Sequence, residues 1–298
     1  MIGSHLCEAL LNRGDRVRIL DDLSTGSLAH KPSGAELIRG DIRDRDAVAL
    51  AMVDMDGCFH LAAIASVERA NRQWIETHTV NLTGTITVFD VARQAGDGRG
   101  PLPVVYASSA AIYGDQGADA IAETARPAPL SAYGSDKLAC EYHARVASIV
   151  HGVPTAGLRF FNVYGQRQDP RSPYSGVISI FCDRIARGEQ IEIMGDGLQT
   201  RDFVYVADAV RALILTMERI SAEPVAFNVC TGRPTSVLDL AAVIAKLCGN
   251  RPRFVFREPR RGEIRHSLGD LTSARDRLGF QASESLESGL AKSLGIFG

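Results

Sequence analysis

Apolar and polar residues follow two alternating patterns along the first 160 positions of the chain. Short apolar runs bounded by turn residues predict strands, whereas apolar residues repeated every three or four positions predict helices. The predicted strands are 17–20, 36–39, 57–61, 104–107 and 155–160, and the predicted helices are 2–12, 45–52, 73–95 and 133–147. Strands that alternate with helices indicate βαβ units with right-handed connections, and therefore a parallel sheet.

The pattern changes after Tyr164, where prolines and glycines crowd a loop and the later elements become shorter and mixed. We therefore predict two parts in the chain. A parallel-sheet domain covers 1–164, and the chain returns to it around 203–230. A smaller mixed α/β lobe takes the remaining segments, 165–202 and 231–298.

Composition narrows the classes of function. The 298 residues carry a formal net charge of −2, which favours neither nucleic acid nor an anionic membrane surface as a partner. No apolar run approaches the roughly 18 residues of a membrane span, and the N-terminus lacks the basic-then-apolar pattern of a secretion signal. The six cysteines form no C-x-x-C pair and no Cys/His cluster with zinc spacing. We expect reduced thiols, no metal site and a cytoplasmic location.

Candidate chemistry gathers around the strand 104–107. Ser108 and Ser109 follow this strand, and the carboxyl edge of a parallel sheet is where ligands bind. Tyr133 and Lys137 are four residues apart in a predicted helix, so their side chains lie on one face. A phenol is a poor base at neutral pH, but a neighbouring lysine cation favours its ionised form. A serine hydroxyl at the strand end can then relay a proton between substrate and phenol.

These residues resemble a known catalytic set. Ser109 with Tyr133-x-x-x-Lys137 resembles the triad of the extended short-chain dehydrogenase/reductases. The segment SSAAIYGD, followed by YGSDK, is similar to the corresponding segments in the UDP-sugar 4-epimerase branch of the NAD-dependent epimerase/dehydratase family. The resemblance covers 2–280. It implies a Rossmann-type doubly wound parallel sheet that binds NAD, a smaller mixed α/β lobe that binds the UDP-sugar, and Ser109, Tyr133 and Lys137 as catalytic residues.

The beginning of the sequence departs from this pattern. The family opens with a strand and then G-G-x-G-F-I-G-S-H-L, whereas this sequence opens MIGSHL, so Gly3 alone matches the phosphate-binding glycines. The first strand of the sheet is therefore expected to be missing. We expect a truncated record or a misplaced start, and weak NAD binding by the sequence as given. The alternative is a product impaired in cofactor binding.

Asp21 indicates which dinucleotide binds. It follows the second family strand, close to the usual position about 20 residues after the glycine turn. A carboxylate there accepts the ribose hydroxyls and repels a 2′-phosphate, and no arginine follows directly, so NAD is favoured over NADP. Besides Gly3 and Asp21, the resemblance assigns cofactor contacts to Asp22, Asp41, Ile42, Ala62, Ala63, Asn81, Tyr133, Lys137 and Phe160.

Three later motifs resemble the family's substrate-binding segments: RFFNVYG from 159, GDGLQTRDFVYVAD from 195 and PRRGEIRHS from 259. Arg201 and Arg260 would hold phosphates, for which a guanidinium fork is suited. Glu263 stands where the family has an aspartate that bonds the uridine ribose. The resemblance assigns substrate contacts to Ser109, Asn162, Val177, Met194, Arg201, Arg260, Glu263 and Ser267.

Ala110 and Ala111 indicate the branch of the family. Dehydratases carry an Asp-Glu pair after the catalytic hydroxyl and decarboxylating relatives carry a Glu, whereas two alanines cannot act as acid or base. Epimerisation needs only removal and return of a hydride at C4. The resemblance therefore implies 4-epimerisation of UDP-sugars through a 4-keto sugar, with Tyr133 and Ser109 moving the 4-hydroxyl proton. A UDP-sugar dehydratase or decarboxylase and a non-catalytic dinucleotide-binding protein stay open as alternatives.

Two further expectations rest on the resemblance. Ser267 stands where a bulky tyrosine would restrict the enzyme to UDP-glucose and UDP-galactose, so N-acetylated UDP-sugars are expected to be accepted as well. A UDP-glucuronate epimerase could carry a small residue there too. A homodimer is expected through a four-helix bundle built from 73–95 and 133–147.

Overall fold

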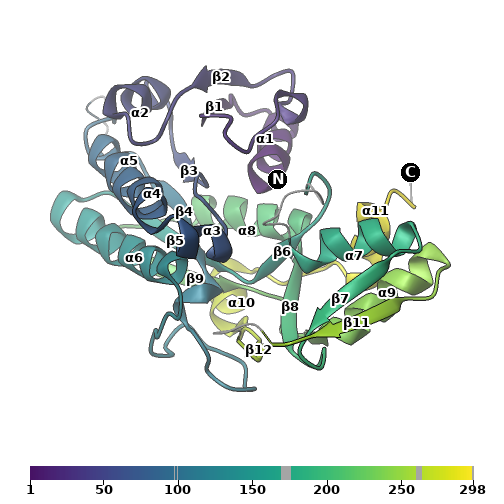
Figure 1. Cartoon of the computed structure of the whole chain (residues 1–298). Helices are drawn as coiled ribbons and strands as arrows, with labels where there is room; N and C mark the ends of the chain where they lie inside the picture. The colour runs from purple at the N-terminus through teal and green to yellow at the C-terminus, as the bar shows by residue number, and fades with distance from the viewer. Residues whose placement is uncertain (97, 99, 169–175, 260–263, 297–298) are drawn as a thin grey trace.

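A computed structural model describes residues 1–96, 98, 100–168, 176–259 and 264–296 (Figure 1). The helical segments are α1 (Ile2–Arg13), η1 (Leu28–His30), α2 (Arg45–Met52), α3 (Val67–Arg72), α4 (Trp74–His78), the π-helical η2 (Thr79–Thr83), α5 (Gly84–Ala92), η3 (Ala110–Ile112), α6 (Ala132–His151), α7 (Val177–Ala186), α8 (Val206–Glu218), α9 (Val237–Cys248), α10 (Thr272–Leu278) and α11 (Leu286–Ser293). The strands are β1 (Arg18–Asp21), β2 (Glu36–Arg39), β3 (Cys58–His60), β4 (Val104–Ser109), β5 (Thr155–Phe160), β6 (Asn162–Tyr164), β7 (Gln190–Met194), β8 (Thr200–Tyr205), β9 (Val225–Val229), β10 (Pro234–Ser236), β11 (Arg253–Arg257) and β12 (His266–Ser267).

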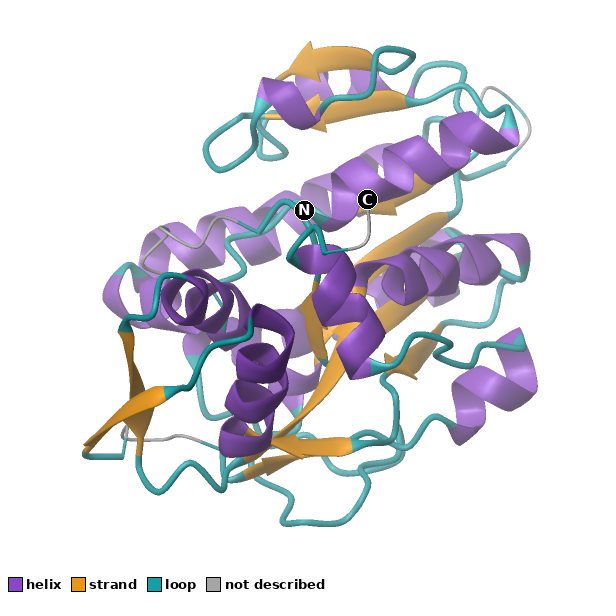
Figure 2. Ribbon diagram, turned by 90° about the vertical axis from the view of Figure 1, so that its right-hand side faces the viewer, coloured by secondary structure: helices purple, strands orange, loops and turns teal. Residues whose placement is uncertain are grey.

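The central sheet is parallel and has the order β3-β4-β5-β9. Alternation along β4 sends side chains to both faces, as a strand requires. Val104 and Tyr106 pack in one core with Ala147 of α6, whereas Val105 packs in another core with Leu213 of α8. Helices therefore cover both faces of the sheet, and Figure 2 shows the strands passing between them. This is the Rossmann-type arrangement that the sequence predicts.

The strands β1 and β2 form a parallel pair of their own beside α2 (Figure 1). Asp21 ends β1, opposite Arg39 at the end of β2. Within the described residues, no strand pairs with both β1 and β3. The predicted parallel sheet is therefore present as two sheets of two and four strands.

A second core lies among β7, β8, α7 and α9. Ile191 and Ile193 of β7 are fully buried against Leu240 and Ile244 of α9 and Phe181 of α7. The outer strand β11 pairs in parallel with β7, while β8 lies between β10 and β12 and also pairs with β6. These elements are short and mixed, as expected for the smaller lobe. The predicted boundaries between the two parts stay a prediction.

Most predicted elements differ from the observed ones at an end. The helix predicted as 133–147 extends from Ala132 to His151, and the strands predicted as 17–20 and 57–61 are Arg18–Asp21 and Cys58–His60. The strand predicted as 104–107 continues to Ser109, because Ser108 and Ser109 pair in register with the last two residues of β5. The helix predicted as 73–95 is divided into α4, the π-helical η2 and α5. By contrast, α2, β2 and β5 agree with the prediction to the residue. In the described part of the chain, no helix is long and apolar enough to cross a membrane.

Candidate active site

The start of α6 is fixed against the segment that follows β4. Ser131 caps the helix, and its Oγ accepts a hydrogen bond from Gly134 N at 3.1 Å. A Cβ at position 134 would lie only 2.5 Å from the carbonyl oxygen of Ala111, so only glycine permits this approach. The first turn of α6, which carries Tyr133, therefore lies directly against the residues after Ser109.

Lys137 brings a buried cation to this point. Its side chain is 3% exposed, and its Nζ donates to the carbonyl oxygen of Ala107 in β4 at 2.8 Å. The same Nζ lies 5.9 Å from the centre of the Tyr133 ring. The structure thus brings Tyr133, Lys137 and the end of β4 together, as the spacing in the sequence predicts.

Ser109 is the last residue of β4 and caps the short helix η3. Its Oγ accepts a hydrogen bond from Ala111 N at 3.2 Å. A hydroxyl that accepts from the backbone keeps its own proton for donation. Ala110 and Ala111 follow it, so the next two side chains offer no acid or base. Phe160, the predicted cofactor contact at the end of β5, is opposite Ser109 in the sheet.

His60 is a buried residue of the site that sequence reasoning missed. It ends β3, and its Nε2 lies 2.9 Å from Thr85 Oγ1. Burial, aided by the charge of Lys137, lowers the pKa of His60 to about 3. The imidazole is therefore neutral at physiological pH and adds no second cation beside Lys137. A histidine inside an otherwise apolar predicted strand was the signal that could have found it.

Asn81 holds the loop that follows β3. Its Oδ1 accepts from Ile64 N at 2.7 Å, and its Nδ2 donates to Ile64 O at 3.1 Å. The side chain is fully buried within the π-helical η2. This clamp fixes Ala62 and Ala63, the two small residues predicted to let a backbone approach a phosphate. Both polar atoms of the Asn81 side chain therefore bond the backbone of this loop.

Asp21 has the surroundings of a ribose acceptor. It ends β1, and its Oδ1 accepts from Leu23 N at 2.7 Å. The pKa of the Met1 ammonium is lowered by burial, and the charge of Asp21 opposes that shift. Asp21 therefore lies within electrostatic reach of the first turn of α1, which contains Gly3. A carboxylate here suits the adenosine ribose of NAD, and Gly3 in the first turn of α1 is the one phosphate-binding glycine of the family pattern that the sequence contains.

The other predicted cofactor residues on this side have partners of their own. Asp22 Oδ1 accepts from the backbone and hydroxyl of Ser24. The carboxylate of Asp41 is bonded by the Arg43 guanidinium, which holds the pKa of Asp41 below its usual value. Ile42 is buried against α5.

The predicted substrate residues lie on the smaller lobe and its border. Ser267 of β12 is directly opposite Arg201 of β8 in a parallel pair, so the structure brings these two together. Asn162 is exposed at the start of β6, which pairs with the same β8. Val177 begins α7 and Met194 ends β7.

Arg260 and Glu263 lie outside the described residues, and their predicted contacts stay predictions.

Asp202, which sequence reasoning also missed, fixes the loops beside Ser267. It is fully buried, and its carboxylate accepts from the backbone of Thr231, Gly232 and Gly269. Burial raises the pKa of Asp202 despite these hydrogen bonds. One carboxylate thus ties β8 to the segment after β9 and to the segment after β12.

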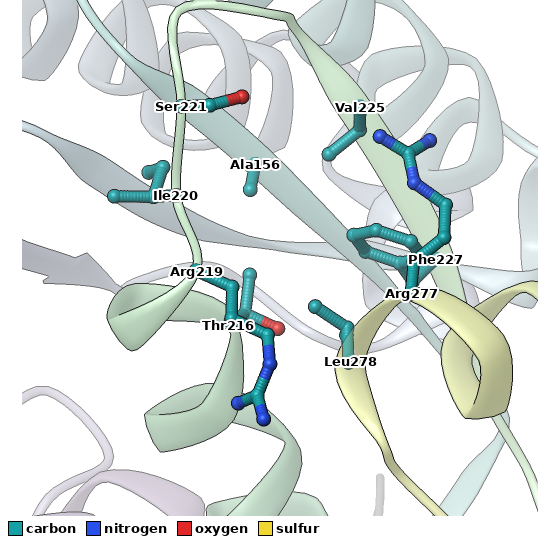
Figure 3. A pocket seen from close by; sticks show the side chains of 9 residues that line it. All are labelled: Ala156, Thr216, Arg219, Ile220, Ser221, Val225, Phe227, Arg277 and Leu278. Carbon is teal, nitrogen blue, oxygen red and sulfur yellow. The ribbon is translucent and has the colours of Figure 1, made fainter.

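A small pocket lies away from these residues (Figure 3). It is formed by the start of β9, the residues after α8 and the end of α10, and none of the predicted site residues lines it. The side chains of Arg219 and Arg277 extend in different directions rather than toward a shared point (Figure 3). Arg277 is paired with Glu223. Among the residues that the structure describes, no group of three or more His, Cys, Asp or Glu side chains could hold a metal ion.

Comparison with known proteins gives consistent matches. The model of the NAD dependent epimerase/dehydratase family matches residues 1–230. The UDP-glucose 4-epimerase of Mycolicibacterium smegmatis is 35% identical over 303 residues, covering 99% of this chain and 95% of its own length. The Thermotoga maritima UDP-glucose 4-epimerase, solved with UDP-glucose, has a TM-score of 0.94 at 33% identity, covering 100% of this chain and 95% of its own. A UDP-N-acetylglucosamine 4-epimerase from Methanobrevibacter ruminantium M1, solved with UDP-N-acetylmuramic acid, has a TM-score of 0.92 at 31% identity, covering 100% and 94%.

Proposed function

The chain belongs to the NAD dependent epimerase/dehydratase family, and we propose that it interconverts UDP-sugars that differ in configuration at C4, with NAD as cofactor. One observation of the structure carries this proposal. Lys137 and Tyr133 lie on one face of α6 against the end of β4, where Ser109 is followed by two alanines. This site can move a proton at a hydroxyl, but it lacks the acidic side chains that dehydration would need at that place.

Each residue has a role that its surroundings support. NAD, when bound, supplies the acceptor and donor of the hydride at C4. Tyr133, whose ring centre lies 5.9 Å from Lys137 Nζ, would take the proton of the 4-hydroxyl as the general base. Ser109 donates from its hydroxyl to the same sugar oxygen and steadies it. Once the 4-keto sugar has turned in the pocket, Tyr133 returns the proton to the new 4-hydroxyl.

The cofactor is held by elements on the β1 side of the site. Asp21 would accept the hydroxyls of the adenosine ribose, and the first turn of α1 with Gly3 would face the diphosphate. The loop of Ala62 and Ala63, clamped by Asn81, would let the backbone approach the cofactor. Lys137 keeps two further ammonium protons besides the one donated to β4, and these can bond the nicotinamide ribose.

The substrate is held by the smaller lobe. Arg201 would hold the diphosphate of the UDP group, because a guanidinium can bond two phosphate oxygens at once. Ser267 lies beside Arg201 and would face the substituent at C2 of the sugar. A serine leaves room for an N-acetyl group and offers a hydroxyl to its amide. We therefore propose that UDP-N-acetylglucosamine and UDP-N-acetylgalactosamine are accepted beside UDP-glucose and UDP-galactose.

A panel assay tests the reaction type. The protein is incubated with NAD and with each of UDP-galactose, UDP-N-acetylgalactosamine and UDP-glucuronate, and the products are separated by anion-exchange chromatography. We expect the 4-epimer of the first two sugars. Release of CO₂ from UDP-glucuronate, or loss of water from UDP-galactose or from the UDP-glucose formed from it, would instead support the decarboxylase or dehydratase alternative. Binding of NAD without turnover of any sugar would support a non-catalytic protein.

We further propose that the protein is a cytoplasmic homodimer. The outer sides of α4 and α6, which adjoin one another (Figure 1), carry large apolar side chains that are exposed in the single chain. Ile75 is 83% exposed, and the others are Trp74, Tyr142, Val146, Ile149 and Val150. Exposed apolar patches of this kind mark protein interfaces. A second copy that packs the same face would bury them in a four-helix bundle.

The proposed cytoplasmic location rests on the cysteines. All six cysteines are free thiols, which suits a reducing compartment.

A further inference from the structure

The two serines at the end of β4 face opposite sides of the sheet. Ser108 continues the row of Val104 and Tyr106, which pack with α6, whereas Ser109 continues the row of Val105. Ser108 is 2% exposed, and its Oγ donates to Glu141 Oε1 of α6 at 2.5 Å. The residue next to Ser109 is thus bonded to the helix that carries Tyr133 and Lys137.

Glu141 is held in turn by a buried arginine. Arg159 of β5 donates from Nε to Glu141 Oε1 at 2.9 Å and from Nη2 to Oε2 at 2.8 Å. The side chains of Arg159 and Glu141 are 9% and 10% exposed. This two-point geometry fixes both distance and orientation, because the guanidinium fork and the carboxylate are planar. Strands β4 and β5 are therefore both bonded to one carboxylate on α6.

The remaining guanidinium nitrogen of Arg159, Nη1, bonds residues outside α6. This nitrogen donates to Tyr113 Oη at 2.8 Å and to the carbonyl oxygen of Glu123 at 2.9 Å. Burial raises the pKa of Tyr113 to about 12, so the phenol keeps its proton and donates to Asn228 Oδ1 at 2.6 Å. The charges of the ion pair are thus surrounded by hydrogen-bond partners on several elements, and their relative positions are well determined.

A buried ion pair is weak evidence for stability, because desolvation offsets most of its attraction. Its placement is more informative. Glu141 lies one helical turn after Lys137 and two turns after Tyr133, while Ser108 directly precedes Ser109. The bond from Ser108 to Glu141 therefore connects the two elements that must present a hydroxyl and a phenol to one substrate oxygen. A displacement of about 1 Å between such groups can lower a rate by about 10²-fold.

We propose that Ser108, Glu141 and Arg159 form a positioning network that sets the distance between Ser109 and Tyr133. The proposal rests on the proposed epimerase function. Ser108 does not act on the substrate; it acts through Ser109, because its bond to α6 decides where the end of β4 lies. The buried ion pair serves as the fixed point to which this bond is made.

The test compares two buried serines. Ser108→Ala removes the bond from β4 to α6, and Ser148→Ala removes a similar bond from α6 to the carbonyl oxygen of Ala222, at 2.8 Å and away from the site. Ser148 is 6% exposed, so both variants lose one buried hydroxyl. We expect similar decreases in Tm, but a fall in kcat of about tenfold or more for Ser108→Ala alone. The KM for UDP-galactose should change less than about twofold in both.

A double-mutant cycle separates positioning from a general loss of structure. If Ser108 acts through Ser109, then Ser108→Ala should cause little further loss of kcat in a Ser109→Ala background. Multiplication of the two losses would overturn the proposal, as would equal kcat values for Ser108→Ala and Ser148→Ala in an active protein. Failure of the unsubstituted protein to epimerise any UDP-sugar would instead overturn the proposed function, and this inference with it.

Discussion

At the scale of single residues, the site is organised by a lysine that is almost completely buried. The Lys137 ammonium uses one of its three donors on the carbonyl oxygen of Ala107. Burial of a charge costs free energy unless a partner compensates it, so a buried lysine at this place indicates a function for its cation. The neutral His60 beside it adds no competing charge. The Lys137 ammonium is therefore fixed by β4 at 5.9 Å from the centre of the Tyr133 ring.

Removing the Tyr133 hydroxyl tests its role as the base. We expect Tyr133→Phe to lower kcat by ~10²-fold or more, because general acid–base catalysis contributes about 10²–10⁴-fold. Binding of the UDP-sugar, measured by calorimetry, should be nearly unchanged, since the diphosphate is held elsewhere. Tyr142→Phe on the exposed side of the same helix is the matched control. Full activity of Tyr133→Phe would contradict the proposed mechanism.

The residue opposite Arg201 tests substrate breadth. Ser267→Tyr would fill the space beside C2 with an aromatic ring, so we expect kcat/KM for UDP-N-acetylgalactosamine to fall far more than for UDP-galactose. Ser267→Ala, which keeps the space, should retain both activities. Equal losses on the two sugars, or no turnover of the acetylated sugar by the unsubstituted protein, would rule out the assignment of Ser267.

At the scale of elements, the site depends on one interruption of a helix and on one close contact between a helix and the segment after a strand. The π-helical η2 interrupts the helical run between α4 and α5 and presents Asn81 to the backbone of Ile64. Such single π turns are frequent at functional sites. Close contact between α6 and the residues after β4 depends on Gly134. The side chains that we propose as catalytic are therefore placed by α6 and β4, and the loop beside them by η2.

The face of α4 and α6 makes a prediction about assembly. A glutamate at position 149 would have to be desolvated inside the proposed four-helix bundle, so Ile149→Glu should shift the protein from dimer to monomer. The molar mass is measured by sedimentation velocity over a range of concentrations. Ile296→Glu replaces an isoleucine that is also exposed but lies outside this face, and it should leave the mass unchanged. A monomeric unsubstituted protein would contradict the dimer.

At the scale of the whole molecule, stability should depend on pH through His60. Its pKa is about 3 in the folded protein and about 6.5 when unfolded, so the unfolded state binds more protons between these values. Stability therefore decreases as the pH falls through this range, by about 2 kcal/mol between pH 7 and pH 5. His60→Gln, which can still bond Thr85, should flatten the pH dependence of urea unfolding. The exposed His143→Gln should not, and an equal slope in all three proteins would contradict the assignment.

The sequence predicts the alternating strands and helices well, but it does not reveal the side-chain contacts that connect these elements. The strand at 155–160 agrees to the residue, because each of its positions is buried and most are apolar. Ser109, Tyr133 and Lys137 could be proposed as catalytic residues because helical spacing and the family resemblance point to them, and the structure places Tyr133 and Lys137 beside the end of β4. The Arg159–Glu141 pair and the Asn81 clamp depend on contacts between distant segments, which periodicity does not show. The extension of β4 through two serines was missed, because their pairing with β5 outweighs their low strand preference.

The most direct test of the proposed function follows a deuterium atom. UDP-galactose labelled with deuterium at C4 is incubated with the protein and NAD, and the products are analysed by NMR and mass spectrometry. We predict that UDP-glucose forms with its deuterium still at C4, because the hydride is removed from and returned to the same carbon. Product whose deuterium has exchanged with solvent, or no UDP-glucose at all, would contradict the account.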